Sequence, residues 1–371
     1  MKRLIALASA LLSSCGLAQG GADPLQPFYD FIRAQPGDVA LQVVSVAPDG
    51  TQKAALSHNP AQPMPLASSM KVVVLAAYAR AVAAGTLRAD TPVTLAEWEA
   101  FYLPGLDGDA HADSLKALGL PADEYGRAKD PKKTVPLDTL ARFMIETSDN
   151  AATDALLFRL GKNAVPETIR ALGLTGQGDI GPIAGMFTAW DREGSTYLKL
   201  TPTQQRARDW ALAEQVRKTP ALRDPQTLNE RWGRSVPALQ RPLQNTTPPL
   251  GTAGDYAALF GRVLGGQGFK PAELAIMRRH LGWVMRVNPD NAKVYNAVYS
   301  KGGSLGAGVL TQNYALDVKG GGKVAYSLFL RNIPVNRYEQ LGAQLDSFIL
   351  ATTFDPAAQR KLLDVLDTSR R

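Results

Sequence analysis

Residues 65–77, PLASSMKVVVLAA, place a serine and a lysine at the start of a long apolar segment. The segment continues to Ala84 and stops at Gly85, a residue that suits a helix C-terminus. A helix that is apolar on every side is a buried helix, so we expect it in the core of the fold. Ser68 and Lys71 lie one helical turn apart on one face. Serine needs a base to become nucleophilic, and a buried, partly neutral lysine can be that base.

Strand patterns occur at both ends of the chain. Residues 41–46 and 51–56 flank a Pro-Asp-Gly turn and predict a hairpin. Residues 294–299, 309–318 and 324–330 also have the β-branched and aromatic composition of strands, and the segments between the two groups are mainly helical. We therefore expect an α/β (α+β) fold, with an antiparallel sheet built from both chain ends, flanked by helices, plus an all-α lobe.

This pattern predicts one two-lobed domain over residues 24–371. The α/β lobe would comprise about 24–66 and 290–371, and the helical lobe about 67–289.

Two stretches of the predicted helical lobe are expected to be insertions, at about 96–135 and 176–245. The first belongs to a loop-like region. The second is rich in Pro, Gly, Gln and Arg and is too long for a plain connection. We expect one helix in it, with Thr201 as N-cap and Pro202 at its first position.

The composition is that of an ordinary globular protein. The chain has 371 residues, of which 45% are apolar and 20% charged. Its formal charge is +7, but the basic residues are scattered among acidic ones and form no stripe with interleaved aromatic residues. A nucleic-acid partner is therefore not expected.

The N-terminus has the pattern of a signal peptide over residues 1–18. Lys2 and Arg3 precede the apolar run 4–12, and small residues follow. The run is too short to span a bilayer, and no later stretch reaches the roughly 20 apolar residues that a membrane span needs. We therefore expect an exported protein that is periplasmic, secreted or attached to a membrane.

Cys15 is the only cysteine, so no disulfide within the chain can form. Its place after Leu-Ser-Ser resembles a bacterial lipoprotein cleavage box. In that case residues 1–14 would be a lipoprotein signal and Cys15 would carry a lipid anchor. Ordinary cleavage after Ala18 is the alternative, and the sequence leaves both open.

Two further motifs follow Ser-x-x-Lys in the chain. Residues 148–150 read Ser-Asp-Asn at a predicted helix end, and residues 301–304 read Lys-Gly-Gly-Ser at a predicted strand end. Each alone is explained as a polar helix end or a turn. In this order and on these elements, the three motifs resemble those of the serine β-lactamase and penicillin-binding protein superfamily, most closely the class A β-lactamase-like serine hydrolases. The segment Leu-Gly-Trp-Val-Met at 281–285 adds to the resemblance.

The resemblance implies a role for each motif residue. Ser68 would be the nucleophile, Lys71 its base or proton relay, and Ser148 the group that passes a proton to the leaving nitrogen. Backbone N–H groups of Ser68 and Ser304 would form the oxyanion hole. The residues implied to bind substrate are Asn150, Lys301, Gly302, Gly303 and Ser304. No metal or other cofactor is implied.

The chain departs from the family pattern at two places. Gly302 stands where the family has Thr or Ser, so a hydroxyl that helps to bind a substrate carboxylate is missing. Class A β-lactamases also hydrolyse their acyl-enzyme with a glutamate. Residues 175–186, where we expect that residue, contain only Asp179 as an acid. Asp191 and Glu193 are the next candidates; without a base, the acyl-enzyme would persist, as it does in penicillin-binding proteins.

Two other interpretations of short motifs are weaker. Residues 302–306 satisfy the Gly-x-Ser-x-Gly pattern of α/β-hydrolases, but that fold needs a catalytic histidine after the serine, and all three histidines precede it. We expect these histidines to be surface or structural residues. Residues 107–113 carry Asp107, Asp109, His111 and Asp113 in alternation but lack the central Gly and terminal Glu of a calcium loop. We expect a solvated acidic loop there instead of a Ca²⁺ or Zn²⁺ site.

The sequence thus predicts a serine hydrolase or acyltransferase whose Ser68 forms an acyl-enzyme with a β-lactam or a related amide. The alternatives are a D-alanyl-D-alanine peptidase-like penicillin-binding protein and a non-catalytic exported binding protein on the same fold. The expected partner is a small-molecule β-lactam or a peptidoglycan-like peptide, and we expect a monomer.

Overall fold

The computed structural model describes residues 23–232, 237–247 and 249–368. The predicted signal peptide and Cys15 lie outside these residues. The described residues form two compact units: unit 1 lies within Met1–Ser69, Gly251–Gln267 and Gly282–Arg371, and unit 2 within Met70–Leu250 and Gly268–Leu281. Across the described ranges, no helix combines the length and the apolar character needed to cross a membrane.

Unit 1 holds the main sheet and the helices that pack on it. Its elements are α1 (Gln26–Ala34), η1 (Pro36–Asp38), β1 (Val39–Val46), β2 (Gln52–His58), β3 (Met64–Pro65), α13 (Ala253–Gly265), α15 (Trp283–Val287), α16 (Asn291–Val294), β7 (Tyr295–Leu305), β8 (Val309–Val318), β9 (Lys323–Leu330), α17 (Val335–Phe354) and α18 (Pro356–Thr368). The chain passes between the units four times: within η2 (Ala67–Met70), within β6 (Leu250–Gly251), between Gln267 and Gly268, and between Leu281 and Gly282.

Unit 2 is mainly helical. Its elements are α2 (Lys71–Ala83), β4 (Pro92–Thr94), α3 (Leu95–Glu99), α4 (Ala110–Ala117), β5 (Thr134–Pro136), α5 (Leu137–Glu146), α6 (Asn150–Leu160), α7 (Ala164–Ala171), α8 (Ile183–Arg192), α9 (Gly194–Tyr197), α10 (Pro202–Lys218), η3 (Pro220–Arg223), α11 (Pro225–Trp232), α12 (Pro237–Thr246) and α14 (Pro271–Leu281).

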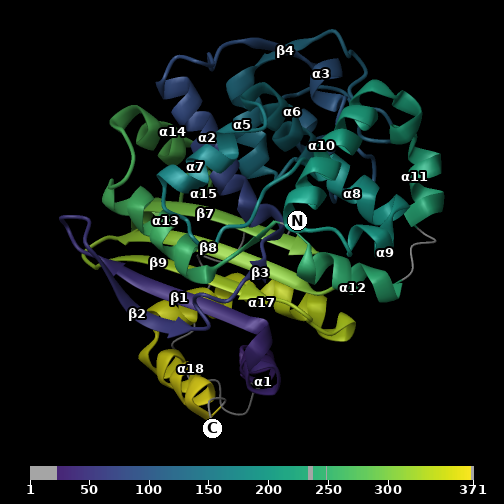
Figure 1. Ribbon diagram of the computed structural model, residues 1–371. Helices are drawn as coiled ribbons and strands as arrows, with labels where there is room; N and C mark the ends of the chain where they lie inside the picture. Colours follow the sequence, from purple (N-terminus) through teal and green to yellow (C-terminus); the bar gives the residue numbers. More distant parts are fainter. Residues whose placement is uncertain (1–22, 233–236, 248, 369–371) are drawn as a thin grey trace. The chain divides into compact units, whose positions relative to one another are not determined.

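The five-stranded sheet has the order β2-β1-β9-β8-β7 (Figure 1). Every neighbouring pair is antiparallel, and β1 from the N-terminal part lies directly beside β9 from the C-terminal part. The predicted hairpin is present, with Gly50 at φ 85° in its turn, a conformation that glycine adopts without strain. The prediction of an antiparallel sheet built from both chain ends is therefore confirmed.

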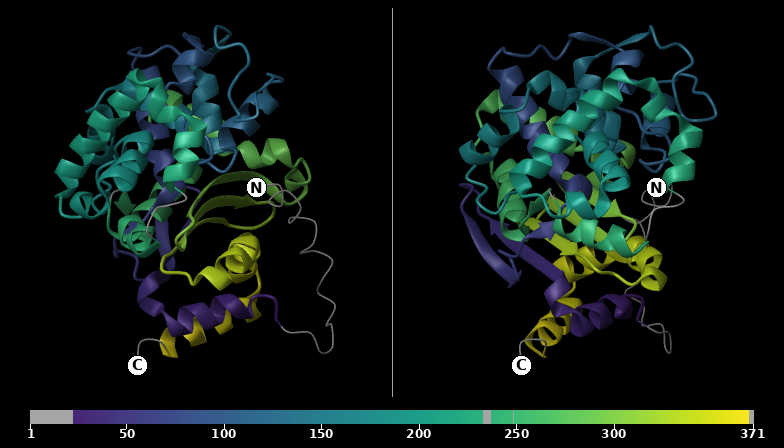
Figure 2. Two further views of the ribbon diagram at one scale, coloured as in Figure 1. Left: turned by 90° about the vertical axis from the view of Figure 1, so that its right-hand side faces the viewer. Right: turned by 45° about the vertical axis from the view of Figure 1, so that its right-hand side comes forward.

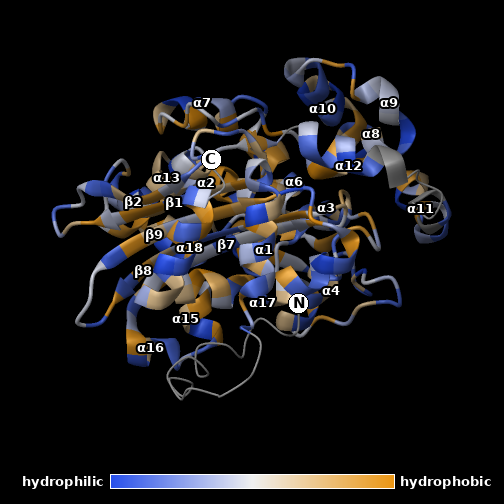
Figure 3. Ribbon diagram, turned by 90° about the horizontal axis from the view of Figure 1, so that it is seen from below, coloured by the Kyte–Doolittle hydropathy of each residue, from blue (hydrophilic) through white to orange (hydrophobic). Residues whose placement is uncertain are grey.

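Side chains alternate between the two faces of this sheet. Leu41 of β1 and Leu328 of β9 belong to a core shared with α1, α17 and α18, in which Phe28 stacks on Phe348 with ring centroids 4.4 Å apart. The two views of Figure 2 show α1 and α18 side by side, and the hydropathy colouring of Figure 3 shows apolar residues along the strands. On the opposite face, Phe329 packs against Tyr256 of α13.

The core of unit 2 is α2. All nine residues from Lys71 to Ala79 are buried, and the helix packs against α5, α6, α7 and α14. The prediction of a buried helix is confirmed, and its end is marked by Gly85 at φ 75°.

The prediction for residues 176–245 is correct for one helix and wrong for the rest. The Thr201 side chain accepts from the N–H of Gln204 at the start of α10, as predicted. The described part of the stretch also contains α8, α9, α11 and α12. These helices are short, and α11 and α12 begin at proline, so the sequence resembles loop composition. The loop-like region at 96–135 likewise contains α3 and α4.

Replacing Phe348 by alanine tests the core beneath the sheet. Phe348 is 0% exposed, so Phe348→Ala is expected to lower the free energy of unfolding by about 3–5 kcal/mol. Phe354→Ala, in the same helix but at a side chain that is 46% exposed, is the matched control and should cost less than about 1 kcal/mol. Urea unfolding followed by circular dichroism measures both. Equal losses would contradict this account of the core.

Candidate active site

The two neighbouring serines of η2 have different surroundings. Ser69 is fully buried, and its hydroxyl contacts Thr311 Oγ1 at 2.8 Å and accepts from Asn313 Nδ2 at 2.9 Å. Its backbone N–H donates to Leu66 O at 3.0 Å. These contacts fix η2 on strand β8, whereas Ser68 is partly exposed. Of the two serines, only Ser68 is partly exposed.

Two glycines of strand β7 allow close approaches, Gly303 to the residues at η2 and Gly302 to strand β8. A Cβ atom added at Gly303 would lie 2.5 Å from Ser68 N and 2.9 Å from Leu66 O. A Cβ atom at Gly302 would collide with the Gln312 side-chain oxygen of β8. Gly302 therefore has a local explanation: the Gln312 side chain occupies the space that the hydroxyl residue of the family pattern would need.

Lys301 lies in β7 just before these glycines. It is 5% exposed, its backbone oxygen accepts from Asn313 Nδ2 at 3.0 Å, and its Nζ donates to Gly302 O at 2.8 Å. The Lys-Gly-Gly-Ser motif was predicted at a strand end, and it forms the last part of β7, which ends one residue later at Leu305.

The position of Ser304 also bears on the α/β-hydrolase pattern. Ser304 is exposed in β7, and after a short turn the chain continues as strand β8. A nucleophile elbow instead lies between a strand and a helix. The local structure therefore does not fit that interpretation.

Lys71 is the most enclosed charged side chain of the predicted site. It is 0% exposed, and its Nζ donates to Ser148 O at 2.6 Å, Ser148 Oγ at 3.2 Å and Asn150 Oδ1 at 2.7 Å. Ser148 has a φ of 68°, a strained conformation for a residue with a side chain. This backbone conformation places both the carbonyl and the hydroxyl of Ser148 within hydrogen-bond distance of Lys71 Nζ. Unit 2 thus brings together Lys71, Ser148 and Asn150.

Burial and nearby carboxylates have opposing effects on this lysine. Burial is the larger effect and lowers the pKa of Lys71 from 10.5 to about 8, although the negative charges of Asp149, Asp107 and Asp154 act in the opposite direction. At pH 7 a lysine with this pKa is neutral in roughly one molecule in ten. The amine is therefore able to accept a proton under physiological conditions.

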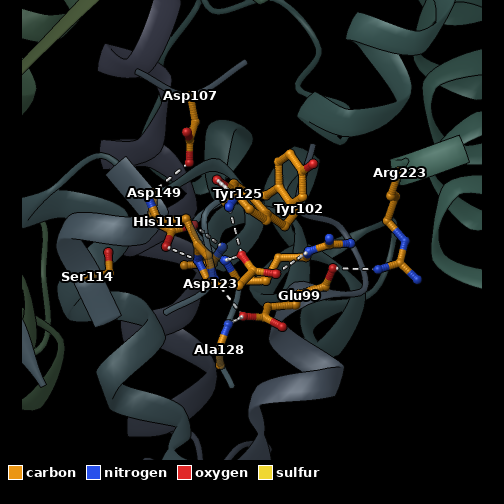
Figure 4. Close-up of polar contacts among 12 residues, drawn as sticks. Glu99, Tyr102, Asp107, His111, Ser114, Asp123, Tyr125, Ala128, Asp149 and Arg223 are labelled. Carbon is orange, nitrogen blue, oxygen red and sulfur yellow. Dashed lines mark hydrogen bonds and ion pairs between the residues drawn. The ribbon is translucent and has the colours of Figure 1, made fainter. Parts of the chain in front are cut away.

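The middle residue of Ser-Asp-Asn points away from the lysine. Asp149 caps α6 by accepting from Ala152 N at 2.8 Å, and its other oxygen lies 2.8 Å from His111 Nδ1. The second ring nitrogen of His111 lies 3.2 Å from Glu99 Oε1 (Figure 4). Because an imidazole donates from both nitrogens only when it is charged, this geometry favours the imidazolium.

Electrostatics agree with this assignment for His111. Burial alone would lower its pKa, but the charges and hydrogen bonds of Asp149 and Glu99 outweigh burial and raise the pKa of His111 to about 10. The imidazolium in turn holds the pKa of Asp149 below its ordinary value despite burial. A buried positive charge therefore stabilises the corner that carries Ser148 and Asn150.

The expectation of a solvated acidic loop at residues 107–113 is wrong for two of its members. His111 is 0% exposed, and Asp107 accepts from the His111 backbone N–H at 2.9 Å with a largely buried carboxylate. We expected the histidines to be surface or structural residues. All three are buried, because His58 and His280 are enclosed as well as His111, so none of them is a surface residue. Within the described ranges, no group of three or more His, Cys, Asp or Glu side chains is arranged to hold a metal ion.

The segment expected to carry a deacylating glutamate begins α8 instead. Both oxygens of the buried Asp154 accept backbone N–H groups at the start of this helix, from Ile183 at 2.7 Å and from Ala184 at 2.7 Å. Asp154 lies one helical turn after Asn150 in α6, a spacing that sequence reasoning missed. Burial raises its pKa to about 7.

The other acids considered for this role are no better placed. Glu193 forms an ion pair with Arg208, whose Nε donates to Glu193 Oε1 at 2.8 Å. Asp179 and Asp191 are partly exposed.

The fold described above is that of the β-lactamase family of serine hydrolases. Residues 27–282 match Beta-lactamase2, described as the β-lactamase enzyme family. The match spans more than half of the chain, and the protein belongs to this family. A search of curated proteins finds no match.

Solved structures share the fold at low sequence identity. A β-lactamase from Sphaerobacter thermophilus DSM 20745 is 18% identical with a TM-score of 0.52, over 90% of this chain and 100% of that one. The chromosome-encoded β-lactamase of Vibrio parahaemolyticus is 11% identical with a TM-score of 0.53, over 90% and 100%. The structure of PBP-A is 16% identical with a TM-score of 0.50, over 89% and 95%. At these identities the likeness establishes the fold.

The charge of His111 makes the stability of the protein depend on pH. Because its pKa rises from 6.5 to about 10 on folding, its stabilising contribution is full below about pH 6.5 and is lost as the pH rises through about 10. The difference in urea midpoint between the wild type and His111→Gln is therefore expected to shrink steadily from pH 6.5 to 10. A difference that stays constant or widens would show that the buried imidazole is neutral.

Proposed function

We propose that the protein is an exported serine hydrolase or acyltransferase in which Ser68 forms an acyl-enzyme with a β-lactam or a related amide. The observation that carries this proposal is the environment of Lys71. A buried amine with a pKa of about 8 contacts Ser148 and Asn150 and follows a partly exposed serine by three residues. Membership of the β-lactamase enzyme family supports the same reaction class.

The proposed acylation accounts for each proton. The Ser68 hydroxyl oxygen bonds to the amide carbonyl carbon, and its proton passes to neutral Lys71. The carbonyl oxygen becomes negative and is stabilised by the backbone N–H groups of Ser68 and Ser304. The C–N bond then breaks, and Lys71 returns the proton through the Ser148 hydroxyl to the leaving nitrogen. The contacts of Lys71 with Ser148 support this relay.

Substrate binding is assigned to the remaining motif residues. Asn150 would donate its amide N–H₂ to a substrate carbonyl, because its Oδ1 already accepts from Lys71. Lys301 would supply positive charge, and Gly302, Gly303 and Ser304 would present the backbone of β7. The Gln312 side chain beside Gly302 offers polar groups where the family pattern has a hydroxyl.

A D-alanyl-D-alanine peptidase-like activity is the second candidate. The observation that favours it is the start of α8, where the apolar Ile183 and Ala184 stand in the segment expected to carry a glutamate. PBP-A is among the proteins that share the fold. Both candidates require the same acylation of Ser68. They differ in the amide that is cleaved and in whether the acyl-enzyme formed with a β-lactam is hydrolysed or persists.

Export is part of the proposal and is supported by the signal-peptide pattern of residues 1–18. A β-lactam or a peptidoglycan-like peptide would be met outside the cytoplasm, so the location and the proposed substrate class agree. Cleavage after Ala18 and lipid attachment at Cys15 are the two forms that this export could take.

Ser68→Ala tests the nucleophile. The purified protein is expected to become covalently labelled by a fluorescent penicillin, detected by gel fluorescence and by the added mass, and Ser68→Ala is expected to abolish the label. Ser45→Ala, at an exposed position of β1, is the matched control and should be labelled like the wild type. Labelling that survives in Ser68→Ala, or a wild type that never reacts, would refute the proposal.

Gly303→Ala tests the close approach of β7 to Ser68. The added Cβ would lie 2.5 Å from Ser68 N, so β7 or η2 must shift, and the labelling rate is expected to fall by at least about 100-fold. Gly306→Ala is the control, because a Cβ there meets nothing within 4 Å. Labelling rates measured under pseudo-first-order conditions decide the comparison. Equal rates for both variants would show that the approach is not required for acylation.

A further inference from the structure

Asp107 carries a buried carboxylate oxygen that has no hydrogen-bond donor among the described residues. Its Oδ2 accepts from the His111 backbone N–H at 2.9 Å, which fixes the orientation of the carboxylate (Figure 4). Its Oδ1 is buried, and no residue that the structure describes donates to it. Buried polar atoms are normally hydrogen-bonded, so an unpaired one in a native protein indicates a bound water or a functional role.

Asp107 differs in this respect from the two other carboxylates whose charges act on Lys71. Asp149 uses both of its oxygens, one as the cap of α6 and one in contact with the His111 ring. Both oxygens of Asp154 accept from backbone N–H groups at the start of α8. The unpaired oxygen is therefore particular to Asp107 among these three acids.

Asn150 has a complementary group. Its Oδ1 accepts from Lys71 Nζ at 2.7 Å, and this contact identifies the other end of the amide as the NH₂ group. No residue that the structure describes accepts a hydrogen bond from Asn150 Nδ2. An amide NH₂ group offers two donors. The proposed function uses one of them for a substrate carbonyl, so the second is available for another acceptor.

Asp107 and Asn150 line the same small cavity, whose volume is about 10 Å³. All residues around it belong to unit 2. The rest of the lining consists of apolar residues, such as Ala184 of α8, and of Tyr102, whose hydroxyl already donates to Tyr125 O at 3.0 Å. A cavity of this size is just large enough to hold one water molecule when polar partners face it.

We propose that one water molecule is bound in this cavity between Asp107 and Asn150, and that Asp107 acts through it as a positioning residue for the Asn150 amide. The water accepts from Asn150 Nδ2 and donates to Asp107 Oδ1. The amide is then held at both ends, by Lys71 at its oxygen and by the water at its nitrogen. The water site follows from the cavity and these two polar atoms, whereas its benefit for substrate binding rests on the proposed function.

The charge state of Asp107 suits this contact at neutral pH. Burial and the charge of Asp149 raise the pKa of Asp107 to about 6, while His111 and Lys71 act in the opposite direction. The carboxylate is therefore ionised at pH 7, and an ionised carboxylate can only accept hydrogen bonds. The Nδ2 of Asn150 can only donate. Water both donates and accepts, so one molecule satisfies both groups.

Electron density tests the water site directly. A crystal structure of the purified wild type, at a resolution that shows ordered waters, is expected to contain one water within hydrogen-bond distance of Asp107 Oδ1 and Asn150 Nδ2. In Ala184→Val the two added methyl groups enter the cavity while Asp107 keeps its contact with His111, and the water is expected to be absent. A wild-type cavity without a water, or a direct hydrogen bond between Asn150 and Asp107, would overturn the proposal.

Labelling by a fluorescent penicillin tests the positioning role. Rates measured over a range of concentrations give a half-saturating concentration, which reports binding, and a limiting rate constant, which reports acylation. Ala184→Val and Asp107→Ala are expected to raise the half-saturating concentration by about 10-fold, the effect of roughly one hydrogen bond. Asp107→Asn keeps a polar group at the cavity and should stay within about 3-fold of wild type. Ala189→Val, at a buried residue of α8 away from the cavity lining, is the matched control for overpacking.

The comparisons separate the water from the other effects of each substitution. Asp107→Asn and Asp107→Ala remove the same charge near Lys71, so equal changes in these two variants would assign the effect to charge and overturn the positioning role. Equal half-saturating concentrations in wild type and Ala184→Val, or an equal rise in Ala189→Val, would overturn it too. A wild type that never becomes labelled would refute the proposed function, whereas electron density alone decides the water site. Should Asp107→Ala fail to fold, the two valine variants carry the comparison.

Discussion

A lysine ammonium without access to water is the constraint around which the helical unit is organised. Removing such a cation from solvent costs several kcal/mol unless acceptors surround it. Lys71 obtains three of them from only two residues, the carbonyl and hydroxyl of Ser148 and the amide oxygen of Asn150. The left-handed backbone of Ser148 and the start of α6 at Asn150 are the local means of aiming these oxygens. Each residue of the Ser-Asp-Asn motif therefore has its own physical task.

A row of buried charged side chains that alternate in sign starts at Lys71 and leads away from the Ser-Asp-Asn motif. Lys71 is near Asp149, Asp149 contacts His111, and His111 contacts Glu99. In a medium of low dielectric constant such a row is stable only as a whole, because removal of one member leaves a buried partner uncompensated. The row extends from the motif into helices α4 and α3, which belong to the region of residues 96–135. Residues 96–135 therefore supply buried charges that stabilise the Ser-Asp-Asn corner.

The sequence predicts those features of the fold that produce a periodic spacing of apolar residues over a short stretch of chain. The hairpin at 41–56, the buried helix after Ser68 and the three C-terminal strands follow from the spacing of apolar residues, and all are present. The short helices of 176–245 were missed because their turns are too few to establish a period. The pairing of His111 with Asp149 joins residues 38 positions apart, and no local pattern encodes it. The raised pKa of Asp107 depends on burial, which its acidic, glycine-containing loop sequence conceals.

Gly302 and Gln312 face each other across β7 and β8 and compete for one volume. A hydroxyl residue at 302 would require the end of the flexible Gln312 side chain to move aside. The absence of a side chain at Gly302 therefore leaves room for a polar side chain from the neighbouring strand.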